Sequence, residues 1–188
     1  MPVYHSAHNE AEGVRVACGC AILPMATSAR GPAPPRAPPA GAAGAAGDDL
    51  GGKPDIVDEA LTYFRANVFF KNFEIKGPAD RVLVYLTLFT HYCLTKVAPI
   101  KTEADGRREL ARLSIARPTI PGEPGFPLSG MFPDPAGGEE AELCRSYFKQ
   151  IRETLVSRLA DRIYADGAPN KFWMAFSKRK FMNKVLTG

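Results

Sequence analysis

The sequence predicts a mainly α-helical fold, a single helical domain with one apolar central helix enclosed by others. Two observations carry this prediction. Residues 82–94 are apolar on almost every face at helical spacing, and such a helix must be surrounded by other elements. Residues 139–165 repeat apolar side chains every three or four positions, as one face of a long amphipathic helix does. Strand-like alternation is poor even in residues 14–23, which leaves room for a minor β-hairpin at most.

Glycine and proline divide the chain into its expected parts. The chain has 188 residues, a formal net charge of +4 and 45% hydrophobic residues, which suits one globular domain. Many of its 17 Gly and 17 Pro fall in residues 31–47, which consist of Gly, Ala and Pro apart from Arg36. That run cannot bury enough apolar surface to offset its ordering entropy. We therefore predict an N-terminal segment at 1–30 that packs on the body, a flexible Pro/Gly/Ala-rich insert at 31–53 and a helical domain at 54–188. A Pro-rich run can also be a ligand for aromatic-lined grooves, although no repeated basic PxxP pattern surrounds this one.

The first predicted helix begins at Asp55, whose carboxylate can cap free backbone amides of the first turn. Asp58 and Glu59 then suit the positive end of the helix dipole. An apolar stripe follows at helical spacing, formed by Val57, Ala60, Leu61, Phe64 and Val68. We expect the cluster after this helix to join the core: Phe69, Phe70, Phe73 and Ile75.

The next two helices differ in polarity. Gly77 and Pro78 break the chain and start the apolar central helix, since proline is well placed in a first turn, and Pro99 prevents it from continuing. Residues 102–114 predict a short and mostly polar helix that turns Leu110 and Leu113 toward the core.

A loop and the longest helix complete the predicted domain. Residues 118–135 contain six Pro and three Gly and predict a loop, from which Phe126 and Leu128 plug into the body. Residues 139–165 predict the long helix, with acidic side chains at its start and Gly167 as a stop. Its apolar stripe consists of Cys144, Tyr147, Phe148, Ile151, Leu155, Leu159 and Ile163.

The C-terminal stretch at 169–186 interleaves aromatic and basic residues and holds no acidic residue. We predict that its aromatic rings, Phe172, Trp173 and Phe176 among them, are mostly core and that its cations form an outer, positive face. These cations are the candidate partner-contact residues: Lys171, Lys178, Arg179, Lys180 and Lys184. Such a patch suits an acidic protein surface. The alternative is a basic helical nucleic-acid-binding module, against which stand the low net charge and the lack of a recognition-helix signature.

No constellation in the sequence indicates an enzyme, a cofactor site or a metal site. The chain has no phosphate-binding glycine loop, no HExxH and no nucleophile elbow. We expect His91, inside the apolar helix, to be a core histidine with its hydrogen bonds satisfied. His5 lies beside Ser6 without an orienting carboxylate nearby in the sequence, and a metal on His5 and His8 is a weak alternative. The four cysteines, Cys18, Cys20, Cys93 and Cys144, lack zinc or disulfide spacing and suit reduced thiols of a cytosolic protein.

Five blocks of sequence occur together and in order: MPVYHS at 1–6, DIVDEALTYFRANVFFKNFEI at 55–75, ADRVLVYLTL at 79–88, PGEPGFPL at 121–128 and FMNKVLTG at 181–188. Together they resemble the family of subunit 3, the 21-kilodalton subunit, of the actin-related protein 2/3 complex. The resemblance covers nearly the whole chain apart from the insert, which replaces a shorter charged connection. The long second block and PGEPGFPL are its most specific parts.

The resemblance implies a non-catalytic structural and regulatory subunit that supports nucleation of branched actin filaments. It implies a mainly α-helical fold with one enclosed helix, which agrees with the independent interpretation of residues 82–94. The implied partners are the other subunits of the complex, chiefly actin-related protein 3, and the actin filament indirectly. The resemblance implies no cofactor of this chain, no membrane and no nucleic acid, and a cytoplasmic location on the actin cytoskeleton.

Overall fold

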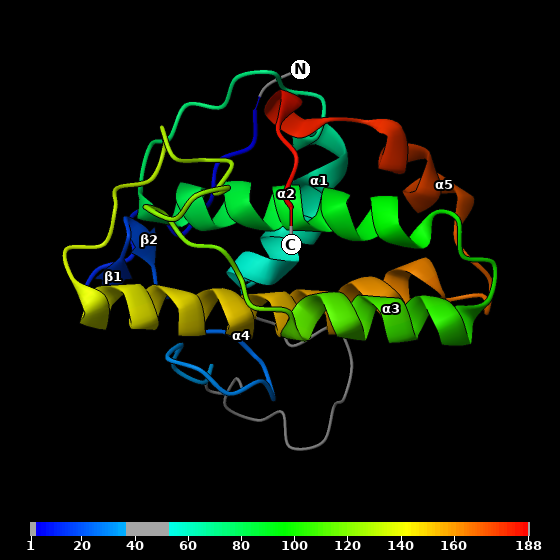
Figure 1. Ribbon diagram of the computed structural model, residues 1–188, viewed down its shortest axis with the longest axis horizontal. Coiled ribbons are helices and arrows are strands. Elements are labelled where there is room, and N and C mark those ends of the chain that lie inside the picture. Colours follow the sequence, from blue (N-terminus) through cyan, green and yellow to red (C-terminus); the bar gives the residue numbers. More distant parts are fainter. Residues whose placement is uncertain (1–2, 37–52, 188) are drawn as a thin grey trace.

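The computed structural model describes residues 3–36 and 53–187 and confirms the mainly α-helical fold (Figure 1). The main helices are α1 (Ile56–Asn67), α2 (Pro78–Val97), α3 (Glu103–Ile115) and α4 (Gly138–Ile163). A short helix, α5 (Lys171–Met174), and two 3₁₀ turns, η1 (Ala175–Lys178) and η2 (Phe181–Asn183), form the C-terminal segment. In the described residues the strands are β1 (Val16–Ala17) and β2 (Cys20–Ala21), which pair antiparallel as the predicted minor hairpin.

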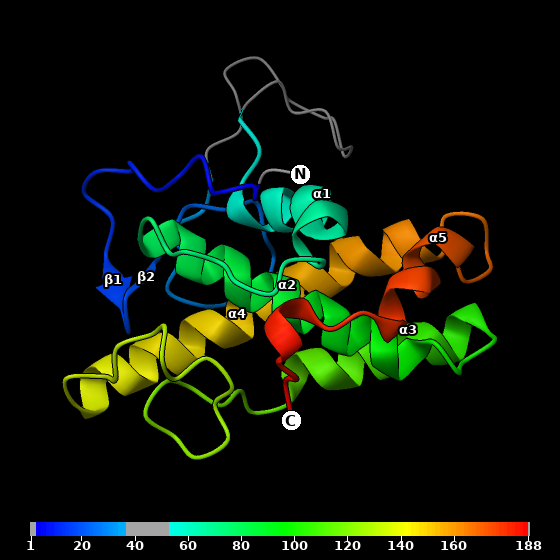
Figure 2. The same ribbon diagram turned by 90° about the horizontal axis from the view of Figure 1, so that it is seen from above.

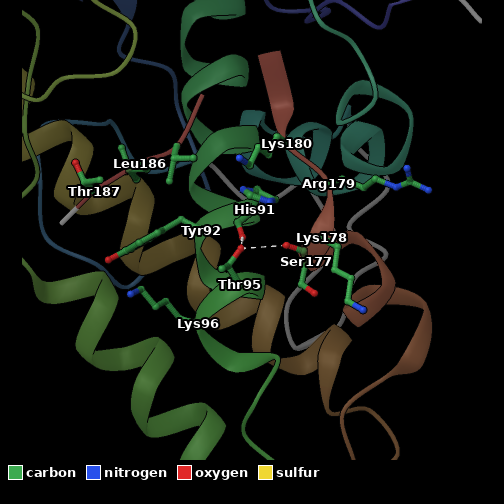
Figure 3. Close-up of a pocket in the computed structure, with 11 residues that line it drawn as sticks. His91, Tyr92, Thr95, Lys96, Ser177, Lys178, Arg179, Lys180, Leu186 and Thr187 are labelled. Carbon is green, nitrogen blue, oxygen red and sulfur yellow. Dashed lines mark hydrogen bonds between the residues drawn. The ribbon is translucent and has the colours of Figure 1, made fainter. Parts of the chain in front are cut away.

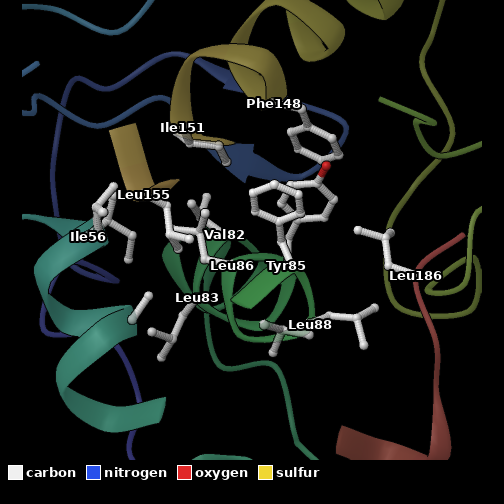
Figure 4. Packing of buried hydrophobic residues seen from close by; sticks show 14 of the residues in the cluster. Ile56, Val82, Leu83, Tyr85, Leu86, Leu88, Phe148, Ile151, Leu155 and Leu186 are labelled. Carbon is white, nitrogen blue, oxygen red and sulfur yellow. The ribbon is translucent and has the colours of Figure 1, made fainter. Parts of the chain in front are cut away.

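Helix α2 is the centre of the fold, as its apolar pattern predicts. It contacts α1, α3, α4, α5, β2 and both 3₁₀ turns, and 15 of its 20 residues are buried. Figure 1 shows α3 and α4 side by side in a layer below α2, and Figure 2 shows α1 on another side. Where α2 meets α4, the rings of Tyr85 and Phe148 stack with centroids 4.0 Å apart (Figure 4). The buried hydroxyl groups of α2 bond to the backbone of the same helix; the Thr87 hydroxyl donates to the Leu83 carbonyl at 2.7 Å.

Asp55 caps α1 and also ties it to α4. Its Oδ1 accepts hydrogen bonds from the backbone N–H groups of Val57 and Asp58, as predicted for an N-cap. Arg158 of α4 donates to both carboxylate oxygens of Asp55, at 2.7 and 2.8 Å. This guanidinium holds the pKa of Asp55 below its ordinary value, although burial acts in the opposite direction. The predicted apolar stripe of α1 is buried throughout.

Helix α4 buries more than its apolar stripe, because the chain before the insert packs against it. The seven predicted stripe residues are all fully buried. Gln150 is also buried; its Oε1 accepts from the Ala33 N–H at 2.9 Å, and its amide donates to the Ala29 carbonyl at 3.1 Å. Residues 31–36, which the sequence assigns to the flexible insert, therefore contact the body at Ala33. Of that insert, residues 37–52 lie outside the described residues, and Lys53 at its end donates to the Ala7 carbonyl at 2.7 Å.

Arg152 of α4 is fully buried and has no carboxylate partner among the described residues. Its Nε donates to the Tyr85 hydroxyl at 2.7 Å, and its guanidinium carbon lies 4.7 Å from the centroid of the Phe89 ring. Cation–π attraction thus replaces an ion pair at this position. The sequence gives no signal for it, because an arginine in a mostly polar helix is ordinarily exposed.

The loop at 118–135 packs as predicted, with Phe126 and Leu128 buried. Glu123, in the PGEPGFPL motif, accepts from the Ile120 N–H at 3.1 Å and pairs with Arg145 of α4 at 2.7 Å. Its hydrogen bonds to Arg145, together with the bond from Ile120, lower the pKa of Glu123 to about 2. The motif therefore fixes the loop to the start of α4.

Candidate partner-docking surface

The C-terminal segment, residues 171–187, crosses the side of α2 that faces away from α4 (Figure 1). Asn170 caps α5: its Oδ1 accepts from the backbone N–H groups of Phe172 and Trp173. Further along, the Met182 N–H donates to the Phe70 carbonyl at 3.0 Å, and the Thr95 hydroxyl of α2 donates to the Ser177 carbonyl at 3.3 Å. Hydrogen bonds thus fix the segment to α2 and to the turn that follows α1.

The inner side of this segment belongs to the core. Trp173 is 5% exposed and stacks on Phe64 of α1 with ring centroids 5.8 Å apart, while Phe181 and Leu186 are fully buried. The guanidinium carbon of Arg65 lies over the Trp173 ring, 5.2 Å from its centroid. The predicted inward packing of Trp173 is therefore confirmed.

The prediction that Phe172 joins the core is wrong, because this side chain is 73% exposed. Helix α5 has one turn, and its cap orients Trp173 inward, so the preceding side chain points outward. Phe69 is also 52% exposed, against prediction, since it follows the last residues of α1 and leaves the buried stripe. The Phe69 ring packs against Phe176 and lies under Arg179, whose guanidinium carbon is 5.2 Å from its centroid.

All five predicted cations, Lys171, Lys178, Arg179, Lys180 and Lys184, are exposed, which confirms the outer positive face. Across residues 3–36 and 53–187, none of the five lies within ion-pair distance of a carboxylate. The structure brings Lys178, Arg179 and Lys180 together around one pocket, whereas Lys171 lies beside exposed Phe172 and Lys184 does not line the pocket. Sequence analysis missed Lys96 of α2, which lies more than eighty positions away in the chain but lines the same pocket.

The pocket has a volume of about 480 Å³ and lies between the last turns of α2 and residues 177–187 (Figure 3). Helix α2 contributes His91, Tyr92, Thr95 and Lys96, and the C-terminal segment contributes Ser177 and the three consecutive cations. Val185 and Leu186 add apolar surface. No acidic residue is among those that line it.

His91 lies at this pocket, but it does not match the predicted core histidine with satisfied hydrogen bonds. The residue is 6% exposed, and its Nε2 has no hydrogen-bond partner among the described residues. Burial lowers the pKa of His91, and the nearby Lys180 charge acts in the same direction. A neutral imidazole therefore lies beside four cations.

The N-terminal histidines and serine form an anchor rather than a reactive pair. Two buried carboxylates do lie beside them, which sequence neighbourhood alone could not reveal. The Ser6 hydroxyl donates to Glu59 at 2.6 Å, and His5 Nδ1 lies 2.7 Å from Asp80. Because the Ser6 hydroxyl is directed to Glu59 and not to His5, the arrangement does not match a nucleophile with its base.

The cysteines are all buried and free, and burial raises the pKa of each thiol. Such thiols are poor nucleophiles. Within residues 3–36 and 53–187, no group of three or more His, Cys, Asp or Glu side chains is placed to hold a metal ion. In the same part of the chain, no helix combines the length and hydropathy needed to cross a bilayer.

Comparison with known proteins identifies relatives over the whole chain. The family model described as the 21-kDa subunit of the ARP2/3 complex, ARPC3, matches residues 1–186. Proteins named actin-related protein 2/3 complex subunit 3 are similar along their full lengths. The relative from Arabidopsis thaliana is 46% identical, over 98% of this chain and 99% of its own. Those from Schizosaccharomyces pombe and Dictyostelium discoideum are 42% and 43% identical over 99% and 98% of this chain, and 100% and 99% of their own.

Proposed function

The chain belongs to the family of the 21-kDa subunit of the actin-related protein 2/3 complex, and we propose that it is a non-catalytic structural and regulatory subunit of that complex. In this role it supports nucleation of branched actin filaments in the cytoplasm, on the actin cytoskeleton. We propose that the chain docks on the other subunits, chiefly on actin-related protein 3. Its link to the actin filament is indirect, through those subunits.

The observation that carries the docking proposal is the C-terminal surface. Phe69 and Phe172 are exposed beside Arg179 and Lys171, and the cations of this surface have no carboxylate partner in the described residues. Aromatic and arginine side chains are enriched at the centres of protein interfaces, where they contribute most of the binding energy. Unpaired cations around them favour an acidic partner and increase its rate of association.

The proposed membership is tested by purifying the tagged chain from cells under native conditions and measuring the mass of the assembly that contains it. We expect the other subunits of the complex in the eluate at equal stoichiometry. An eluate without any of them would contradict the proposal. Retention of RNA or DNA that weakens steeply with salt, in place of those subunits, would instead support the nucleic-acid-binding alternative.

The choice of actin-related protein 3 as the main partner needs its own measurement. Lysine-reactive crosslinking of the intact complex, followed by mass spectrometry, reports which subunit lies beside each lysine. We expect Lys178 and Lys180 to crosslink mainly to actin-related protein 3. Crosslinks from these lysines to other subunits alone would reject that choice while leaving membership of the complex intact.

A further inference from the structure

The pocket at the C-terminal surface has the size and lining of a binding site. Its volume of about 480 Å³ falls in the range of about 300–1,000 Å³ that is usual for ligand pockets. Tyr92 from α2 and Leu186 from the C-terminal segment give it an apolar lining. Val185, at the same pocket, is 47% exposed although it is apolar. An open apolar hollow of this size can accept a large apolar side chain.

The charges around the hollow all have one sign. Lys96 lines the pocket from α2, and the consecutive cations Lys178, Arg179 and Lys180 line it from the C-terminal segment (Figure 3). No carboxylate of the described residues pairs with any of these four cations. A basic occupant would be repelled, and a purely apolar one would leave the cations without carboxylate partners. The complementary occupant therefore carries carboxylates on both sides of an apolar group.

A polar group with an unmet hydrogen bond lies at the same place. The His91 side chain lines the pocket, and its Nε2 lacks a hydrogen-bond partner among the described residues. Leaving a buried polar atom unpaired lowers stability, and such atoms are uncommon without a functional reason. The backbone of an incoming peptide segment offers hydrogen-bonding groups that a simple apolar side chain does not.

From these features we infer that the pocket is the anchor of the docking surface: an acidic segment of the partner subunit inserts one apolar side chain between α2 and the C-terminal segment. Lys96 and Lys180 pair with carboxylates on either side of that side chain. The inference rests on the proposed function, because it takes the occupant from the complex, and the pocket is continuous with the exposed cations of the docking surface.

The test fills the pocket without altering its charge. Thr95 is exposed on α2 and lines the pocket, so Thr95→Trp places an indole in the space of the partner side chain. Thr95→Val loses the same hydrogen bond to Ser177 without filling the pocket, and it should bind as wild type does. Binding of the purified chain to the remaining subunits of the complex, assembled without it, is measured by interferometry. We expect Thr95→Trp to weaken binding about tenfold or more, because the indole keeps the partner's anchor side chain out of the pocket and so has the same effect as loss of that anchor. Ser157→Trp, at an exposed position of α4 outside the pocket, is the matched control and should bind within about twofold of wild type.

A second pair of variants tests the cation rim. Lys96→Glu with Lys180→Glu should weaken binding about tenfold or more and reduce its salt dependence, whereas Lys101→Glu, exposed but outside the pocket, should not. A Thr95→Trp protein that melts like wild type and binds the remaining subunits equally well would overturn the inference alone. Failure of the wild-type chain to bind would overturn the proposed function as well. If Thr95→Trp reduced retention on single-stranded RNA but not binding to the subunits, the occupant would be a nucleic acid and the inference would be wrong.

Discussion

The two ends of the described chain use their polar groups in opposite ways. Residues 5–7, near the N-terminus, bond to two carboxylates from other parts of the chain. Asp80 is fully buried, lies beside His5, and accepts from the Ser6 N–H at 2.8 Å and the Lys76 N–H at 3.0 Å. Glu59 is likewise buried and accepts from the Ser6 hydroxyl and the Ala7 N–H. At the C-terminal segment, by contrast, the cations are exposed and unpaired with any described carboxylate.

The buried polar groups near the N-terminus stabilise the fold, whereas the exposed cations of the C-terminal segment remain available to bind a partner. Buried carboxylates contribute to stability when each acceptor has a donor, which is the case for Asp80 and Glu59. Exposed lysines contribute little to stability even when they are paired. The N-terminal anchor should therefore respond to substitution through stability, and the C-terminal surface through assembly.

The largest expected effect tests whether the inner side of the C-terminal segment is core. Trp173→Ala should lower the free energy of unfolding by about 3 to 5 kcal/mol, because the ring is buried against Phe64. Phe172→Ala, one residue earlier in the same short helix, is the control and should change stability by less than about 0.5 kcal/mol. Urea unfolding measures both. Equal losses would mean that the two aromatic residues are not on opposite sides of α5.

The next effect tests the N-terminal anchor. Asp80→Ala removes the acceptor for two backbone N–H groups and for His5, and it should cost about 3 kcal/mol of unfolding free energy. Asp161→Ala provides a matched control, because that carboxylate is 74% exposed in a surface pair with Arg107 and should matter by less than about 1 kcal/mol. Both values come from urea titrations followed by circular dichroism. If the two variants were equally stable, the contrast between buried and exposed carboxylates would not hold.

The opposite result is expected at the C-terminal surface. Replacing Lys178, Arg179 and Lys180 together by Glu should leave the melting temperature of the isolated chain within a few degrees of wild type. The yield of assembled complex should nevertheless fall, since an acidic partner would then meet three acidic side chains. Native mass measurement of co-expressed subunits gives that yield. An unchanged yield would show that this surface is not an interface.

The sequence was sufficient wherever burial alone decides a position. The apolar helix at 82–94 and the stripe from Cys144 to Ile163 are both confirmed, because periodicity reports directly which face is buried. The sequence was insufficient where the end of a helix, or a helix of one turn, decides whether a side chain points inward or outward. Phe69 and Phe172 point outward because α1 ends and α5 has one turn, and hydrophobicity alone cannot show this. It also failed where partners come from distant segments, as with Lys96 at the pocket, Asp80 beside His5 and Arg152 under Phe89.

The smallest expected effect concerns His91, a buried polar side chain at the pocket that, unlike Asp80 and Glu59, has an atom without a hydrogen-bond partner among the described residues. Burial, aided by the Lys180 charge, lowers the pKa of His91 below its ordinary value of 6.5, while the Ser177 carbonyl acts in the other direction. The unfolded chain therefore takes up a proton at this position before the folded chain does. Stability from the neutral ring is fully present above the ordinary pKa and is lost as the pH falls below it.

His91→Gln removes this titration while keeping a neutral polar side chain. The unfolding free energy of wild type should fall more steeply than that of the variant between about pH 7.5 and pH 5, a range that spans the ordinary pKa of histidine. Both proteins retain His5 and His8, so the difference between the two curves isolates His91. Parallel curves would show that the ring titrates equally in both states and is not desolvated. If the curves instead diverge and binding of the remaining subunits reduces the divergence, the partner has supplied a hydrogen-bond acceptor at the pocket, because an acceptor favours the charged ring.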